Sequence, residues 1–317
     1  METRHWNAGF FAWHNLELGT WNFESKTYLV GVTVLEVIQR SSEFLTQKGV
    51  ESPRLQTELL LAHVLGLQRL QLYLNFERVL NQEELKQLRE LVRRRGQRQP
   101  LQHLVGSTSF CGLEIAVSPK VLIPRPETEL LAERAWESLS QPDAAPPQVV
   151  LDFGTGSGCL AIALAVKCPA VQIHALDIST EAITLARQNA ARHNVADRIQ
   201  FHAGDGFAAL PAGLRFDLIV SNPPYIPSTA IDQLELEVRA HEPRPALDGG
   251  ADGLLFYRRL ASEASPFLKP TCWIMLELGD QQAGAVREIF TRQKWIVEAV
   301  EPDYTGRPRV FVARLPK

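Results

Sequence analysis

The stretch Val149-Val-Leu-Asp-Phe-Gly-Thr-Gly-Ser-Gly158 decides the fold of this chain. Strand-forming apolar residues pass directly into three glycines at alternate positions, and a second apolar run begins at Cys159. A strand, a tight turn and a helix in this order form the repeating unit of doubly wound sheets. Glycines in the turn let the backbone bend sharply and let a flat ligand approach it without a clash against Cβ atoms.

The spacing of these glycines separates three kinds of ligand loop. A dinucleotide fingerprint needs its third glycine at position 159, and a P-loop needs a lysine after the last glycine, but Cys159 and Leu160 stand there. The G-x-G-x-G pattern is instead usual for loops that bind S-adenosylmethionine, with an ordinary glycine-rich turn as the alternative. The candidate cofactor residues here are Gly154, Thr155, Gly156, Ser157 and Gly158.

Strands and helices alternate along the rest of this region, which we expect to be one domain over 127–317. Strands are expected at 148–153, 171–177, 198–203, 215–221, 271–278, 294–301 and 308–314. Helices are expected at 127–139, 158–167, 180–193, 253–264 and 281–292. This alternation predicts an α/β fold with a doubly wound, mostly parallel, seven-stranded sheet. Ligands of such sheets bind at the carboxyl ends of the strands.

Two further strand ends carry acids. Asp177 closes the strand after the glycine loop, where a carboxylate can accept both hydroxyls of an adenosine ribose; a helix N-cap is the alternative. Asp205 and Gly206 follow the next strand, where Asp205 could hold an adenine amino group and Phe207 or its backbone could face the ring. Turns are commonly built from such residues, which is the alternative there.

The fourth strand end reads Asn222-Pro223-Pro224-Tyr225. The side-chain oxygen of Asn222 and the carbonyl of Pro223 can each accept a hydrogen bond, and Tyr225 can pack against a planar group. Such a pocket suits a planar NH₂ group, either the exocyclic amine of a base or a carboxamide. A simple turn is the alternative, because Asn-Pro is a turn sequence.

The amino-terminal part of the chain differs in character. Residues 33–100 are expected to form a small helical domain, with capping-box spacing at Thr33 and Glu36 and again at Asn81 and Glu84. Ser52 and Pro53 predict an N-cap followed by a first-turn proline. The residues of that second helix expected to face inward are Leu55, Leu59, Ala62 and Leu65.

A basic run closes the helical domain at Arg93, Arg94, Arg95 and Arg98. Two interpretations stay open: solvated cations that favour a helix C-terminus, and a patch for an acidic or RNA-containing partner. Residues 101–126 are expected to be a β-hairpin and linker, with Val105–Phe110 and Leu113–Val117 as its strands. The Pro- and Ala-rich segment 141–148 is expected to be a second, short linker.

Composition narrows the class of protein further. The chain has 317 residues, 45% of them apolar, and a formal net charge of −3. That length suggests two domains, and the charge argues against a protein that coats nucleic acid. The chain has no apolar run long enough to predict a membrane span. Its cysteines form no C-x-x-C pair, and no metal site is expected. A cytoplasmic enzyme is therefore the default expectation. Residues 1–32 are interpreted as an extension of undefined role, either disordered or an over-long translation start.

These motifs together resemble one family. The glycine loop, Asn222–Tyr225 and especially Val121-Leu-Ile-Pro-Arg-Pro-Glu-Thr-Glu129 are similar to the HemK-type release factor glutamine methyltransferases, over about residues 33–316. The resemblance implies methyl transfer from S-adenosylmethionine to the glutamine side-chain amide in the Gly-Gly-Gln motif of peptide chain release factors. By motif, Gly154–Gly158 and Asp177 would hold the cofactor and Asn222–Tyr225 would grip the glutamine. Two departures are the first 32 residues and the lack of a tryptophan near Gly206.

The amide nucleophile suggests the mechanism and its rivals. An amide nitrogen is nearly non-basic, so we expect the pocket to orient it for in-line displacement, with the proton leaving to water. An amino-methylating DNA or RNA methyltransferase and a ribosomal-protein glutamine methyltransferase are the alternatives, and a non-catalytic module that has kept the fold is a third. No membrane and no direct nucleic-acid substrate are expected as partners.

Overall fold

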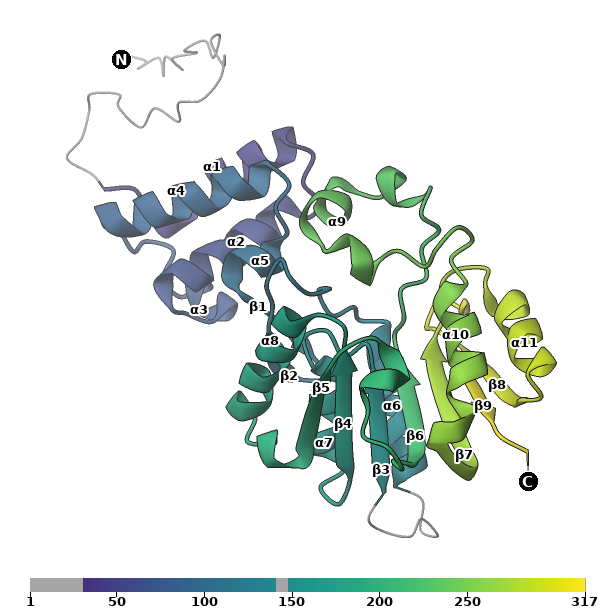
Figure 1. Ribbon diagram of the computed structural model, residues 1–317. Helices are drawn as coiled ribbons and strands as arrows, with labels where there is room; N and C mark the ends of the chain where they lie inside the picture. The colour runs from purple at the N-terminus through teal and green to yellow at the C-terminus, as the bar shows by residue number, and fades with distance from the viewer. Residues whose placement is uncertain (1–30, 141–147, 317) are drawn as a thin grey trace, which may run out of the picture.

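The computed structural model describes residues 31–140 and 148–316 of the chain. Figure 1 shows a helical domain at the amino-terminal end and a layered α/β domain that carries the rest of the described chain. The expected extension at 1–32 falls outside the described residues except for Gly31 and Val32, and so does the expected linker except for Gln148. None of the helices in these ranges is long and apolar enough to cross a membrane.

Seven strands of the described chain form one sheet in the order β5-β4-β3-β6-β7-β9-β8. Neighbours from β5 to β7 are parallel, and β9 runs antiparallel between β7 and β8. The strands are β3 (Val149–Phe153), β4 (Gln172–Asp177), β5 (Ile199–Ala203), β6 (Phe216–Ser221), β7 (Leu268–Glu277), β8 (Ile296–Pro302) and β9 (Pro308–Arg314). This confirms the predicted fold class.

Helices cover both faces of the sheet, as its nearly continuous apolar strands require. One face packs against α6 (Thr128–Leu139), α7 (Cys159–Lys167) and α8 (Thr180–Arg192). The other packs against α10 (Leu255–Glu263) and α11 (Ala283–Arg292), around the buried Tyr257 and Phe290. The four cysteines are free, and Cys159 and Cys168 are buried in apolar surroundings. The sheet order changes direction between β3 and β6, so a ligand is expected at the carboxyl ends of these two strands.

The helical domain contains α1 (Val34–Gln47), α2 (Pro53–Leu65), α3 (Arg69–Tyr73), α4 (Gln82–Gly96) and α5 (Leu101–Val105) around one apolar cluster. Both expected capping boxes are present. The Thr33 side chain accepts from the backbone of Glu36, and Asn81 accepts from the backbone of Glu84, with the glutamates returning the bond in each case. These caps satisfy N–H groups that the helix itself leaves unpaired.

The predicted start of α2 is confirmed, with Ser52 at the N-cap and Pro53 in the first turn, although Ser52 has a left-handed φ of 46° and its side chain makes no capping hydrogen bond. The predicted inner face was wrong in part. Ala62 is buried as expected, but the buried face also includes Leu60 and Leu61, whereas Leu55 is exposed. Apolar residues lie almost all round this helix, so its sequence offers two possible inner faces. Contacts with α1, α4 and α5 select one of them.

The hairpin begins later than predicted. Leu101–Val105 is the short helix α5, which starts after Pro100 and ends at Gly106 in a left-handed conformation. The hairpin proper is β1 (Ser107–Phe110) and β2 (Leu113–Ala116), which pair antiparallel. Cys111 and Gly112 have φ of 50° and 76°, as a two-residue hairpin turn of the primed type requires. The β-prone composition before Gly106 is overridden by contacts with α2 and α4.

The basic run is not wholly solvated, which corrects the first interpretation of it. Arg95 is buried and donates to Glu237 at 2.9 Å, and Arg98 donates to the same oxygen at 2.5 Å. Glu237 lies on α9 (Leu236–His241), in the segment that follows Asn222–Tyr225. Burial favours its neutral form, but the hydrogen bonds from the two guanidiniums outweigh this and lower the pKa of Glu237. Part of the run therefore fastens the helical domain to the α/β domain.

The hairpin is attached through one buried side chain, Asn189 of α8. Its amide nitrogen donates to the carbonyls of Ala116 and Ser157 at 3.0 and 2.9 Å, and its oxygen accepts from the Ala116 N–H at 3.0 Å. Asn189 thereby joins the end of β2 to the glycine loop. Sequence patterns did not single out this residue.

We expect Asn189→Ala to lower the free energy of unfolding by about 2–4 kcal/mol, because it leaves several buried backbone groups unpaired. Urea unfolding followed by circular dichroism measures this loss. Asn75→Ala is the matched control, because Asn75 makes one solvent-exposed hydrogen bond, to Gln71. Equal effects of the two substitutions would contradict a bracing role for Asn189.

Candidate active site

A cavity of about 370 Å³ opens at the carboxyl ends of β3, β4, β5 and β6. It contains most of the residues that the sequence pointed to, brought together from four separate strand ends. Those that line it are Gly154, Gly156, Asp177, Asp205, Gly206, Asn222, Pro223 and Pro224. Its apolar wall comes from residues that were not predicted to lie in the site: Val121, Leu122, Phe153, Ile178 and Phe256.

The glycine loop presents its backbone to this cavity. Gly154 and Gly156 have φ of 79° and 55°, and a Cβ atom added at either position would meet only open space. The N–H groups of Gly154 and Thr155 both donate to the carbonyl of Leu176, at 2.8 and 2.9 Å, which fixes the loop against β4. The loop therefore leaves room for a ligand close to the main chain, as a flat cofactor needs.

The other members of the loop serve the fold. Thr155 and Ser157 are buried and do not line the cavity. A Cβ atom on Gly158 would lie 3.0 Å from the Cβ of Ala186, so this glycine permits close packing of α7 on α8. Direct cofactor contacts by these three residues stay predictions without support from their positions.

Asp152 organises the loop from below. This fully buried carboxylate accepts from the Thr155 hydroxyl at 2.6 Å and from the Ala161 N–H at 3.2 Å. Burial raises the pKa of Asp152 to about 7, although these two hydrogen bonds oppose the shift. The only sign of this role in the local sequence is an acid inside an otherwise apolar strand.

Asp177 braces the loop from the side. One carboxylate oxygen accepts from the Gly156 N–H at 2.8 Å and the other from the Ser179 N–H at 2.9 Å. Burial raises the pKa of Asp177, and the backbone hydrogen bonds act against this. The N-cap of α8 is Ser179, so the N-cap alternative for Asp177 was wrong. Carboxylate oxygens accept more than one hydrogen bond, which leaves capacity for a ligand hydroxyl.

The third strand end differs from the prediction at one position. The Phe207 side chain is buried, with ring centroids 5.1 Å from Phe153 and 4.8 Å from Phe267, so it belongs to the core and does not face the cavity. Asp205 is 68% exposed at its side chain and pairs with Arg259 at 2.5 Å. The Arg259 guanidinium also lies over Gly206, where a Cβ atom would be 2.3 Å from it. An adenine contact by Asp205 stays a prediction.

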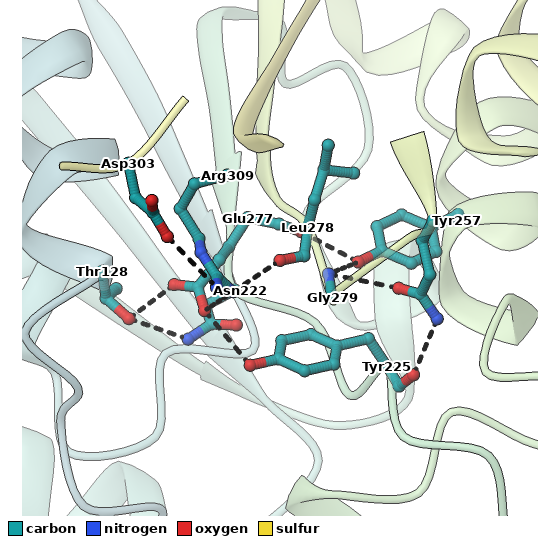
Figure 2. A network of polar contacts seen from close by, with 10 residues as sticks. Thr128, Asn222, Tyr225, Tyr257, Glu277, Leu278, Gly279, Asp303 and Arg309 are labelled. Atoms are coloured by element: carbon teal, nitrogen blue, oxygen red, sulfur yellow. Dashed lines mark hydrogen bonds and ion pairs between the residues drawn. The ribbon is translucent and has the colours of Figure 1, made fainter. Parts of the chain in front are cut away.

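Asn222 is held by Thr128, which is held in turn by Glu277 (Figure 2). Its Nδ2 donates to the Thr128 hydroxyl at 3.0 Å, and that hydroxyl donates to Oε2 of Glu277 at 2.5 Å. Thr128 begins α6 and Glu277 ends β7, so both lie beside the end of β6. The side-chain nitrogen of Asn222 is thereby occupied, and its oxygen stays available as an acceptor.

Tyr225 is held by contacts with β7 and with the segments around Gly253 and Gln282. Its hydroxyl donates to Oε1 of Glu277 at 3.4 Å, and its carbonyl accepts from the side chain of Gln282 at 2.9 Å. A Cβ atom at Gly253 would lie 2.4 Å from that carbonyl, and one at Gly279 would lie 2.8 Å from the tyrosine ring. Packing of Tyr225 against a planar substrate group stays a prediction, because the cavity lining does not include it.

The Pro124–Glu129 motif joins three parts of the molecule. Arg125 donates to the buried Glu242 at 2.6 Å, Thr128 holds Asn222, and Glu129 accepts from the Cys111 N–H of the hairpin at 2.8 Å. Glu242 precedes the segment Pro243–Ala246, part of which lines the cavity. The motif therefore positions the hairpin, the site amide and the outer wall of the cavity together.

This lining fits the cofactor expected from the sequence. It combines an exposed glycine backbone, a braced carboxylate beside it, and an apolar wall, which suit a nucleoside with a ribose and a flat base. Among the described residues, no group of three or more acidic, histidine or cysteine side chains could hold a metal ion.

Comparisons with known proteins agree with this geometry. The family described as PrmC N-terminal domain matches residues 36–106, and the family described as Methyltransferase small domain matches residues 128–238. The release factor glutamine methyltransferase of Geobacter sulfurreducens is 46% identical, over 89% of this chain and 97% of its own length. Proteins of the same name from Chlorobaculum tepidum and Rhodopirellula baltica are 44% and 40% identical, over 81% and 88% of this chain and 89% and 95% of their own lengths.

The fold and the site thus define a methyltransferase of the doubly wound α/β type. Within that class, this chain belongs to the release factor glutamine methyltransferase family. The resemblance noted from its motifs is confirmed, and S-adenosylmethionine, the cofactor expected from the glycine loop, agrees with this membership.

The raised pKa of Asp152 makes a pH-dependent contribution to stability. The folded carboxyl keeps its proton up to about pH 7, whereas in the unfolded chain it ionises near pH 4. The folded state binds more protons in this window, so this contribution to the unfolding free energy is lost as the pH rises. The Asp152→Asn variant has no such titrating group. The difference in unfolding free energy between the variant and wild type should therefore shift in favour of the variant as the pH rises, by up to about 1.4 kcal/mol per pH unit between about pH 4 and 7. Urea unfolding across this range measures the difference, and a constant difference would contradict the raised pKa.

We expect Asp177→Ala to weaken S-adenosylmethionine binding by about 1.5–3 kcal/mol, the range for hydrogen bonds to charged groups. It removes both the candidate ribose acceptor and the brace on Gly156. Calorimetric titration measures the affinity, and circular dichroism checks that the variant is folded. Asp197→Ala, an exposed position in the turn before β5, is the control. Unchanged affinity in folded Asp177→Ala would remove this residue from the site.

Proposed function

We propose that this protein transfers a methyl group from S-adenosylmethionine to the side-chain amide nitrogen of the glutamine in the Gly-Gly-Gln motif of peptide chain release factors. The observation that carries the proposal is the orientation of Asn222, whose nitrogen is occupied by Thr128 and whose oxygen is available at the cavity. A site with a fixed acceptor selects a substrate group that donates, such as an NH₂. Membership of the family points to the glutamine of a release factor as that group.

The residues proposed to hold the cofactor are those already in the cavity: the backbone of Gly154 and Gly156, the carboxylate of Asp177, and the rim at Asp205 and Gly206. When bound, the cofactor supplies an electrophilic methyl group on a sulfonium centre. Its sugar suits Asp177, and the apolar wall that includes Phe153 suits its base.

The proposed catalytic segment is Asn222-Pro223-Pro224-Tyr225. Asn222 and the carbonyl of Pro223 would accept the two hydrogens of the substrate NH₂, which fixes the direction of the nitrogen lone pair. Acceptors at these hydrogens also favour the positive charge that develops on nitrogen. Orientation of this kind supplies about 7–11 kcal/mol in the best cases, so no strong base is required. The proton would leave to water after transfer.

The surroundings of the cavity support a protein loop as substrate. The helical domain and α9 lie beyond the carboxyl edge of the sheet (Figure 1), and ion pairs at Glu237 and Glu242 fix that arrangement. A flipped nucleic-acid base would need phosphate contacts along its path. In this chain Arg95, Arg98 and Arg125 are paired with carboxylates.

We expect the enzyme to add one methyl group to the Gly-Gly-Gln glutamine of an intact release factor and to act poorly on the isolated peptide, which must be ordered on binding. Mass spectrometry of the modified factor measures the transfer. Glutamine→Glu in the factor should abolish it, since a carboxylate has neither the nitrogen nor its hydrogens. Asn222→Ala should lower turnover by about a hundredfold or more, and Asn222→Asp, which keeps an acceptor, should lower it less. Methylation of DNA but not of the release factor at matched salt would overturn the proposal.

A further inference from the structure

We propose that Thr128 and Glu277 are positioning residues that set the direction of the Asn222 carboxamide, and that the ionised form of Glu277 is the form that supports methyl transfer. This rests on the proposed function in one respect, namely that Asn222 acts as an acceptor toward the substrate. Neither residue lines the cavity, so both act through Asn222.

The hydrogens available along the chain of contacts from Asn222 through Thr128 to Glu277 determine which group donates at each contact. A threonine hydroxyl has one hydrogen and can also accept. The 2.5 Å distance between the Thr128 hydroxyl and Oε2 of Glu277 is typical of an O–H donated to a carboxylate. The hydroxyl can then only accept from Asn222, so the carboxamide must turn its NH₂ toward Thr128 and its oxygen away.

The protonated form of Glu277 would favour the opposite orientation of the Asn222 carboxamide. A protonated Glu277 can donate its own hydrogen to Thr128, and Thr128 can then donate to the oxygen of Asn222. The carboxamide would turn over and present its NH₂ at the cavity, where it would oppose the NH₂ of the substrate. The charge on Glu277 thus decides whether Asn222 offers an acceptor or a donor.

Glu277 can change charge near neutral pH. Burial raises the pKa of Glu277 to about 7, against the hydrogen bond from Thr128. Four groups face this carboxyl: Thr128 and Glu127 at the start of α6, Tyr225 after β6, and Arg309 of β9 at 3.9 Å. Tyr257 of α10 donates instead to the backbone carbonyl of Glu277, at 2.9 Å. Arg309 also donates to the Leu278 carbonyl at 2.7 Å and lies 3.6 Å from Asp303, so its charge is shared (Figure 2).

Kinetics of release factor methylation test the role of Thr128. Thr128→Val removes the hydroxyl but keeps the shape, and kcat should fall by about ten- to a hundredfold, as for other small misplacements of a reacting group. Calorimetric affinity for S-adenosylmethionine should stay within about twofold of wild type. Thr128→Ser should restore most of kcat. Thr57→Val, at a buried threonine of α2 whose hydroxyl lacks a partner among the described residues, is the control and should change neither quantity.

A double-mutant cycle separates positioning from general structural damage. In an Asn222→Ala background, Thr128→Val should cause little further loss, because there is no carboxamide left to orient. Losses that multiply in the double variant, an unaltered kcat in Thr128→Val, or a loss of cofactor affinity equal to the loss of kcat would each overturn the proposal.

A third measurement needs no substrate and so distinguishes this proposal from the proposed function. In protein labelled with ¹⁵N-asparagine, the Asn222 side-chain resonance should shift with pH, with a midpoint near the raised pKa of Glu277. In Glu277→Gln the shift should vanish, and kcat should lose the corresponding rise with pH. A resonance that does not respond to pH in wild type would overturn the positioning role, whereas a wild-type enzyme that titrates but does not methylate the release factor would overturn the proposed function alone.

Discussion

The site depends on one hydrogen bond between two neighbouring strands. The Ser221 hydroxyl, buried at the end of β6, donates to the carbonyl of Phe153 at the end of β3 at 2.6 Å. The glycine loop leaves one strand at this level and Asn222 leaves the other. Because the two strands are parallel neighbours where the sheet order changes direction, the bond helps to fix the separation between the glycine loop and the segment that begins at Asn222.

Two buried acids and one half-buried acid surround this junction and tie its loops together. Asp152 lies beneath the glycine loop, Glu277 lies behind Asn222, and Asp177 lies beside Gly156. Leaving water disfavours the charge on a carboxylate, and hydrogen bonds from backbone and hydroxyl groups compensate only in part. Each acid thus costs stability at neutral pH, but each also specifies the orientation of the groups that donate to it. The acids that lower stability thus lie at the candidate active site, where the proposed reaction depends on the orientation of a weak nucleophile.

Much of this architecture could be predicted from local sequence. The glycine spacing, the order of strands and helices, and the capping boxes at Thr33 and Asn81 depend on neighbours in the chain, so their patterns are visible in the sequence. The inner face of α2 and the helix at Leu101–Val105 depend on packing between distant elements, and there local propensity gave the wrong answer. Asn189 and Glu277 act across the fold, and nothing in their local sequence reveals their partners. For Asp152 and Glu277 the one clue in the sequence is a single acid in a mostly apolar strand, Val149–Phe153 and Leu268–Glu277 respectively.

The attachment of the helical domain has a consequence for building hybrid proteins. Arg95 and Arg98 share one oxygen of Glu237, although about 140 residues separate them from it. A relative's helical domain placed on this sheet would have to present cations at these two positions, because Glu237 would otherwise be left without its partners. A lone buried charge of this kind costs several kcal/mol. The natural unit of exchange is therefore discontinuous: the helical domain travels together with α9, and a crossover placed at the apparent boundary near residue 106 would divide it.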